Sequence, residues 1–171
     1  MEAAHNVGMS LEPVAVTRTI VLRVPPGEAF DFLAGADVLP KILKGHGLLP
    51  AVTGTSEQTG PWDMPGSKRL IHLSDRTTVR EEVLRAERGV YFGYRVWDYT
   101  NPLFSRLVDH ASGSFEFRRE GAGTSVAWTY AFTPRGAATR PLLWLIVHLF
   151  YQGYMERCLG ETMRILAEPK P

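Results

Sequence analysis

The chain has 171 residues, with 19 Lys and Arg against 18 Asp and Glu, so its charges nearly cancel. This length fits one domain with a sizeable core. Because no block of like charge occurs, we expect neither a nucleic-acid partner nor docking on an anionic membrane.

The N-terminal residues 1–13 mix small and polar residues without a period, which predicts a flexible tail before a single domain at 14–168. The segment lacks the pattern of a secretory signal, so we expect a cytoplasmic location. The lone Cys158 falls on the apolar face of a predicted helix, which favours a buried hydrophobe over a nucleophile.

The first predicted element is a strand at residues 14–24, rich in Val, Thr and Ile. A short helix follows, which starts near Pro26 and ends at Gly35. Asp37 is placed to cap a second short helix that runs through Leu43. Alternation in the strand predicts an inward face on which Arg18 lies near an end or edge; this face comprises Val16, Arg18, Ile20, Leu22 and Val24.

The middle of the chain predicts an antiparallel meander. Residues 48–55 favour a strand only weakly, and the loop at 56–66 carries Trp62 and Met64, which either border a pocket or pack at the core edge. Residues 99–112 are too apolar for a solvated loop and favour a short helix or a flap. Five further strands are predicted at 68–74, 77–86, 90–98, 113–119 and 125–133.

The C-terminal segment predicts a long helix from Pro141 to Leu166, about 26 residues and roughly 39 Å long. A helix of this length needs a broad curved sheet to cover. Its first part, Leu142–Tyr151, is apolar on all sides but too short to span a bilayer. We expect cover from loops or from a second copy of the chain, ahead of peripheral contact with lipid. The stripe facing the sheet would be Trp144, Val147, Tyr151, Met155, Cys158, Thr162 and Ile165.

A bent sheet and a straight helix cannot touch along their whole length, so either bulky side chains or a guest must fill the space between them. We expect a cavity for an apolar ligand there, with bulky filling as the alternative. The residues predicted to line it are Phe92, Tyr94, Val96, Trp128, Tyr130, Phe132, Trp144, Val147, Tyr151 and Met155.

The candidate catalytic residues are Glu81, Tyr94 and Tyr130. Glu81 would face the cavity between Val79 and Val83, where a carboxylate needs a partner or a raised pKa. The alternative register turns Glu81 outward and buries Thr78 and Leu84, with Arg80 and Glu82 inward.

The sequence gives little indication of a metal site, a cofactor site or an Asp–His pair. The five histidines show no metal-ligand spacing and no phosphate-binding loop occurs, so we expect no metal and no cofactor. Adjacent strand residues point to opposite faces, so Asp109 can orient His110 only if the backbone turns there.

The order of strand, two short helices, meander and long C-terminal helix resembles the SRPBCC superfamily, which includes START domains and birch-pollen-allergen-like proteins. The polyketide cyclase/dehydrase-like branch matches best, over about residues 16–166. The resemblance implies an α+β helix-grip fold, with a curved antiparallel sheet of about six or seven strands around the helix and a hydrophobic cavity between them. The segments that carry it are VPPGEAFDFLAG (24–35), GSKRLIHLSDRTTVREEVLRAERGVYFGYRV (66–96) and GTSVAWTYAFTPRG (123–136).

Members of this superfamily range from carriers to aromatising cyclases, so the resemblance leaves three hypotheses for the function. The first is binding, with transport as an extension, of a hydrophobic small molecule such as a lipid or polyketide-like compound. The second is a cyclase or dehydratase that uses acid–base chemistry on a ligand in the same cavity. The third is a homodimer formed through Leu142–Tyr151 around a filled cavity.

Overall fold

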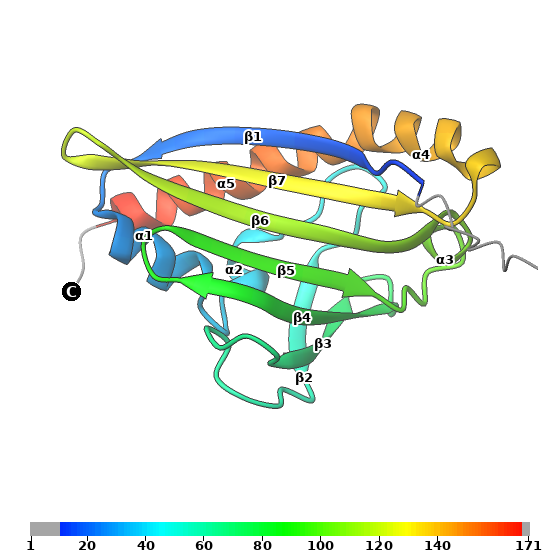
Figure 1. Cartoon of the computed structure of the whole chain (residues 1–171), viewed down its shortest axis with the longest axis horizontal. Helices are drawn as coiled ribbons and strands as arrows, with labels where there is room; N and C mark the ends of the chain where they lie inside the picture. The colour runs from blue at the N-terminus through cyan, green and yellow to red at the C-terminus, as the bar shows by residue number, and fades with distance from the viewer. Residues whose placement is uncertain (1–10, 169–171) are drawn as a thin grey trace, which may run out of the picture.

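Seven antiparallel strands form one sheet in the order β1-β7-β6-β5-β4-β3-β2 in the computed structural model, which describes residues 11–168 (Figure 1). The tail expected at residues 1–13 therefore falls mostly outside the described residues. The strands are β1 Val14–Leu22, β2 Val52–Ser56, β3 Lys68–Leu73, β4 Thr78–Glu87, β5 Tyr91–Trp97, β6 Val108–Glu120 and β7 Gly123–Pro134.

The helices confirm the expected order of two short segments after β1 and one long segment at the C-terminus, and so the helix-grip arrangement. In Figure 1, α4 and α5 run along one side of the sheet, and α1 lies at the end of the sheet where α5 ends. The segments are α1 Pro26–Leu33, α2 Leu39–Ile42, α3 Phe104–Leu107, η1 Ala137–Thr139, α4 Arg140–Ile146, η2 Val147–Tyr151 and α5 Gln152–Ala167.

The sheet is interrupted by irregular pairing at three places. Register shifts occur between Val52 and Gly54, between Val83 and Arg85, and between Val108 and His110. An additional residue on one strand bends that strand and increases its twist. These shifts help the sheet to curve around the C-terminal helix.

Side-chain alternation correctly predicts the inward face of the meander. The buried residues of β7 include the predicted set of Val126, Trp128, Tyr130 and Phe132. In β5 the buried set includes Phe92, Tyr94 and Val96. Glu81 pairs with Val96 across the strands and is itself buried, so the register that turns Glu81 inward is the correct one.

The first strand and helix also follow their sequence signals. Pro26 occupies the first position of α1, and the buried face of this helix is Ala29, Phe30 and Leu33. Arg18 lies on the inward face of β1, an edge strand, where its Nε donates to Glu156 on α5 at 2.8 Å. This ion pair joins the edge of the sheet to the long helix.

Two predictions about element boundaries are wrong. Asp37 does not cap α2, whose N-cap is Val38; the Asp37 carboxylate instead accepts a bond from Lys41 one turn later. Strand β6 begins at Val108 rather than at Gly113, directly after α3. The apolar residues near 107–111 are buried in the sheet, which explains why this segment is too apolar for a loop.

The long C-terminal helix contains a π-helical turn, η2, between α4 and α5. A π turn takes one residue more than an α-helical turn, so it changes which residues before it face the sheet. Leu143 is fully buried, whereas Trp144 is 49% exposed and stacks on His148. The prediction that Trp144 faces inward is therefore wrong, because it assumed uniform α-helical spacing.

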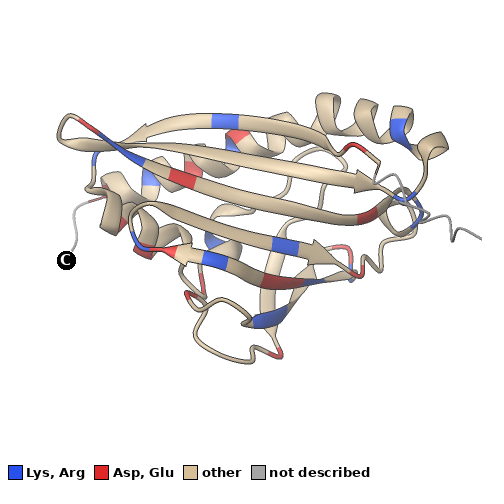
Figure 2. Ribbon diagram, viewed as in Figure 1, with Lys and Arg blue, Asp and Glu red and all other residues tan. Residues whose placement is uncertain are grey.

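The outer side of this helix carries an apolar patch formed by Leu142, Trp144, Leu145 and Leu149, all exposed. Figure 2 shows charged residues of both signs over the sheet and α5, while α4 is largely uncharged. A homodimer through this patch stays a prediction, testable by sedimentation at increasing protein concentration. None of the helices within residues 11–168 is long and apolar enough to cross a bilayer.

Candidate ligand cavity

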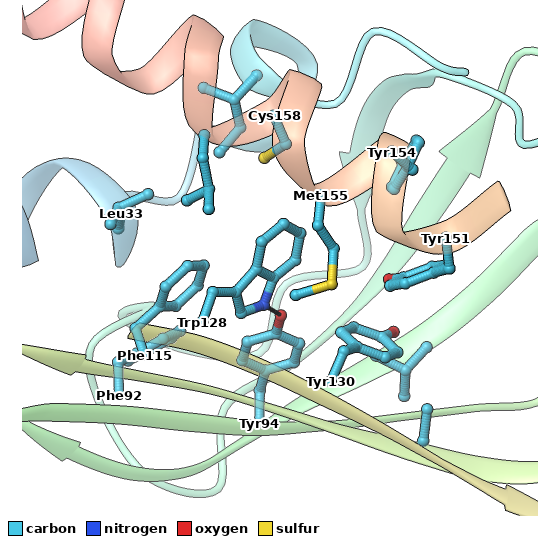
Figure 3. Packing of buried hydrophobic residues seen from close by; sticks show 14 of the residues in the cluster. Leu33, Phe92, Tyr94, Phe115, Trp128, Tyr130, Tyr151, Tyr154, Met155 and Cys158 are labelled. Carbon is cyan, nitrogen blue, oxygen red and sulfur yellow. Dashed lines mark hydrogen bonds between the residues drawn. The ribbon is translucent and has the colours of Figure 1, made fainter. Parts of the chain in front are cut away.

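A cavity of about 130 Å³ lies between the sheet and the helices. Its size is close to that of an engineered cavity of about 150 Å³ in another protein that binds benzene. Figure 3 shows side chains from the sheet and from α5 converging on one another in this region. Of the ten residues predicted to line a cavity, seven line this one: Phe92, Tyr94, Val96, Trp128, Tyr130, Phe132 and Tyr151.

The other three predicted residues lie elsewhere. Val147 and Met155 are buried but do not line the cavity, so they serve as core between the helix and the sheet. Trp144 lies on the outer side of the helix. The interior is thus partly packed by its own aromatic rings and partly open.

Several lining residues were not predicted as ligand contacts. Trp62 is buried and lines the cavity, whereas Met64 is 56% exposed, so the two apolar residues of that loop have different roles. Arg69 could have been found by pairing, because a hairpin turning at residues 74–77 places it opposite Glu81. The lining residues from outside the predicted set include Leu33, Ile42, Trp62, Arg69, Tyr99, Phe104 and Tyr154.

Arg69 and Glu81 form a buried ion pair at the cavity wall. Arg69 Nε and Nη2 both lie near Glu81 Oε2, at 2.8 and 2.7 Å. Arg69 Nη1 donates to the Ala36 carbonyl at 2.9 Å, and its guanidinium stacks 3.6 Å from the centre of the Trp62 ring. All three nitrogens of the Arg69 guanidinium are thus engaged by the protein, and its plane contacts the Trp62 ring.

Burial raises the pKa of Glu81 above its ordinary value of 4.5, although the charge and hydrogen bonds of Arg69 act to lower it. The residue as a whole is 4% exposed. Because both contacts from Arg69 reach Oε2, the pair anchors one oxygen of the carboxylate. A buried carboxyl with a raised pKa beside a cavity is a typical feature of acid–base and ligand-anchoring sites.

Tyr94 is fixed from two sides. Its hydroxyl accepts a hydrogen bond from Trp128 Nε1 at 3.0 Å, drawn in Figure 3. Its ring lies over Gly113 on β6, where a Cβ atom would overlap it. Burial raises the pKa of Tyr94 well above its ordinary value, with a smaller contribution from the charge of Glu81.

Three further tyrosine hydroxyls gather in the cavity, from Tyr99, Tyr130 and Tyr151. The Tyr130 and Tyr151 rings pack with centroids 4.8 Å apart. Burial is the main cause that raises the pKa of each of the three well above 10. All three therefore keep their protons near neutral pH and can donate hydrogen bonds.

The histidine and cysteine candidates lie apart from this chemistry. His110 Nδ1 lies 2.8 Å from Asp109 Oδ2, a contact that the prediction allowed only if the backbone turned. The register shift between Val108 and His110 supplies that irregularity, but neither side chain lines the cavity. Burial raises the pKa of Cys158, so its thiol stays protonated.

No group of three or more metal-ligating side chains occurs within the described part of the chain.

Comparison with known proteins places the chain in a family. The family model described as "Polyketide cyclase / dehydrase and lipid transport" matches residues 13–166. A search of curated proteins found no significant match.

Solved structures share the fold at low sequence identity. Ginseng major latex-like protein 151 from Panax ginseng has a TM-score of 0.67 and 10% identity, over 92% of this chain and 99% of that one. The protein XoxI from Bacillus cereus has a TM-score of 0.65 and 16% identity, over 91% and 96%. Ara h 8.0201 has a TM-score of 0.60 and 14% identity, over 88% and 97%.

The family match covers most of the chain, and the sheet, the terminal helix and the cavity agree with it. The chain belongs to the polyketide cyclase/dehydrase and lipid transport family.

Proposed function

We propose that the protein binds and carries a hydrophobic small molecule in the cavity between the sheet and the C-terminal helix, without transforming it. The cavity itself carries this proposal: about 130 Å³ of space walled mainly by aromatic and aliphatic side chains. Burial of apolar surface would supply about 25 cal/mol for each Å² removed from water. Membership of the family supports hydrophobic ligand binding in general.

The volume of the cavity limits the size of the ligand. A molecule of about one ring fits the present space by comparison with the benzene-binding cavity. A lipid or a polyketide-like chain would require side chains to move, and those that keep some contact with solvent are best placed to do so. These half-buried lining residues are Leu39, Leu43, Pro50, Leu73, Thr77, Tyr99, Asn101 and Phe104.

Filling the cavity is expected to abolish binding. We predict that toluene at 100 times its Kd raises the stability of the wild-type protein by about 2.7 kcal/mol, through preferential binding to the folded state. In Val79→Phe the larger side chain would occupy the space, since Val79 lines the cavity, and the toluene effect should disappear. Thermal unfolding with and without toluene measures both.

The matched control is Val21→Phe, which adds the same atoms to the exposed outer face of β1, where Val21 is 49% exposed. It should keep the full toluene effect. Native mass spectrometry of freshly purified protein would show the mass of any compound that co-purifies. No toluene effect in the wild-type protein, with no co-purifying compound, would contradict the proposed function.

A second candidate function is a cyclase or dehydratase, favoured by one observation: Glu81 lines the cavity and has a raised pKa. The family description names both activities and lipid transport. The variant Glu81→Gln distinguishes the two, because its amide oxygen can still accept from Arg69 while the acid is removed. Lost turnover with retained binding would favour the enzyme; a carrier has no turnover to lose.

A further inference from the structure

The hydroxyl of Tyr99 is buried at the cavity and makes no hydrogen bond of proper geometry with any residue in 11–168. Tyr99 follows β5, and its ring stacks on Phe104 with centroids 5.8 Å apart. Phe104 in turn packs against Phe132 on the cavity floor. A buried hydroxyl without a partner costs free energy, so its position calls for an acceptor that residues 11–168 do not supply.

The surroundings of this hydroxyl define which acceptor fits. The pKa of Tyr99 is raised first by burial, then by the neighbouring Tyr130 hydroxyl and the charge of Glu81, so Tyr99 keeps its proton at neutral pH. The Tyr130 hydroxyl is the nearest candidate acceptor, but the two groups do not meet at the distance and angle of a hydrogen bond. The hydroxyl of Tyr94, by contrast, already accepts from Trp128. Among the described residues, Tyr99 is the cavity tyrosine whose hydroxyl is buried and has no hydrogen-bond partner.

The charge in the cavity disfavours an anionic guest. Among the described residues that line it, Arg69 is the one cation, and its head is taken up by Glu81, the Ala36 carbonyl and Trp62. The carboxylate of Glu81 would repel a second negative charge. An ionised guest would also lose its hydration in this apolar space without a free counter-charge.

We propose that the guest is a neutral, ring-sized apolar molecule with a carbonyl oxygen, and that the Tyr99 hydroxyl donates the hydrogen bond that orients it. This inference rests on the proposed function and specifies its ligand class. The 130 Å³ of space sets the ring size. The unpartnered Tyr99 hydroxyl favours a guest with a carbonyl oxygen as acceptor. A carboxylate guest is disfavoured, because the described lining residues offer it no free cation.

Two probes of nearly equal shape test this inference: acetophenone, which has a C=O group, and α-methylstyrene, which has a C=CH₂ group in its place. In Tyr99→Phe the Kd of acetophenone should rise about tenfold, while the Kd of α-methylstyrene should stay unchanged. The infrared carbonyl stretch of bound acetophenone should lie at lower frequency in the wild-type protein than in the variant. Benzoate should bind neither protein.

The control variant is Tyr154→Phe, which removes another hydroxyl from the cavity wall. The pKa of Tyr154 is raised by burial and by Cys158 rather than by Tyr99, so this hydroxyl belongs to a different neighbourhood. Tyr154→Phe should leave the relative affinity of the two probes and the carbonyl frequency unchanged.

The free protein gives a separate readout. Because the Tyr99 hydroxyl has no partner, Tyr99→Phe should raise Tm by about 3 °C. A lower Tm would mean that the hydroxyl is already bonded in the free protein, and would overturn the inference. If both probes bind the wild-type protein but respond equally to Tyr99→Phe, the inference fails and the proposed function stands. If neither probe binds, both fail.

Discussion

Arg69→Met is expected to lower the free energy of unfolding by about 3–5 kcal/mol, because it leaves the Glu81 carboxylate buried without its partner. Met has a similar length, so most of the packing against Trp62 is kept and the loss is mainly that of charge and hydrogen bonds. Urea unfolding followed by circular dichroism measures the change.

The matched control is Arg80→Met on the neighbouring strand. Arg80 is 43% exposed and pairs with Glu57 at 3.1 Å and with Asp98 at 3.4 Å. Exposed pairs contribute about 0–1 kcal/mol, so this variant should be nearly as stable as the wild-type protein. If Arg69→Met and Arg80→Met lost the same free energy of unfolding, the buried Arg69–Glu81 pair would have no special role in stability. The double variant Arg69→Met/Glu81→Leu should recover most of the loss, since no buried charge remains.

The loss in Arg69→Met should also depend on pH. Arg69 acts to lower the pKa of Glu81, so its removal raises that pKa further above 4.5. A carboxyl whose pKa is higher in the folded than in the unfolded state favours folding fully only below the unfolded value, and this contribution is lost as pH rises through the folded value. The gap between the variant and the wild-type protein should therefore be small near pH 4.5 and widen as pH rises.

Gly113→Ala is expected to destabilise the protein by about 1–3 kcal/mol, because the new Cβ would overlap the ring and hydroxyl of Tyr94. The ring cannot move freely, since Phe115, Phe92 and Tyr130 pack around it. Its displacement would break the hydrogen bond from Trp128 and change the shape of the cavity. Urea unfolding measures stability, and tryptophan fluorescence reports on Trp128.

Gly54→Ala is the matched control, because a Cβ at this strand glycine would meet no atom within 4 Å. It should change stability by less than about 0.5 kcal/mol. A double-mutant cycle with Tyr94→Leu should show a favourable coupling, since the smaller side chain leaves room for the alanine. Additive losses in the cycle would show that Tyr94 is not the group that excludes a side chain at Gly113.

Alternation could predict the inward residues of β5 and β7, because in these strands one face is much more apolar than the other. It could not decide the faces of β3, where Lys68, Leu70 and His72 alternate with Arg69, Ile71 and Leu73. The buried Arg69 is paired with Glu81 on β4, so the answer depends on a neighbouring strand. The alternation within one strand does not show which residue lies opposite on the next strand; that requires the register of the hairpin.

The candidate site was predictable where it coincides with the core and not where it depends on loops. The rings of Phe92, Trp128 and Phe132 follow from strand spacing. Tyr99 and Trp62 reach the cavity from irregular segments, where the backbone path and not a period decides the direction of a side chain. This is why the buried donor of Tyr99 is visible in the structure alone.

The wide turn at Val147–Tyr151 has a consequence for aligning this chain with others. It accommodates one residue beyond what a regular helix would need to bring Leu143 against the strands. A chain with one residue fewer in this segment would continue as an ordinary α-helix and present the same partners to the sheet. A single-residue gap at this place in an alignment would then mark a change in helix type, with the packing on either side conserved.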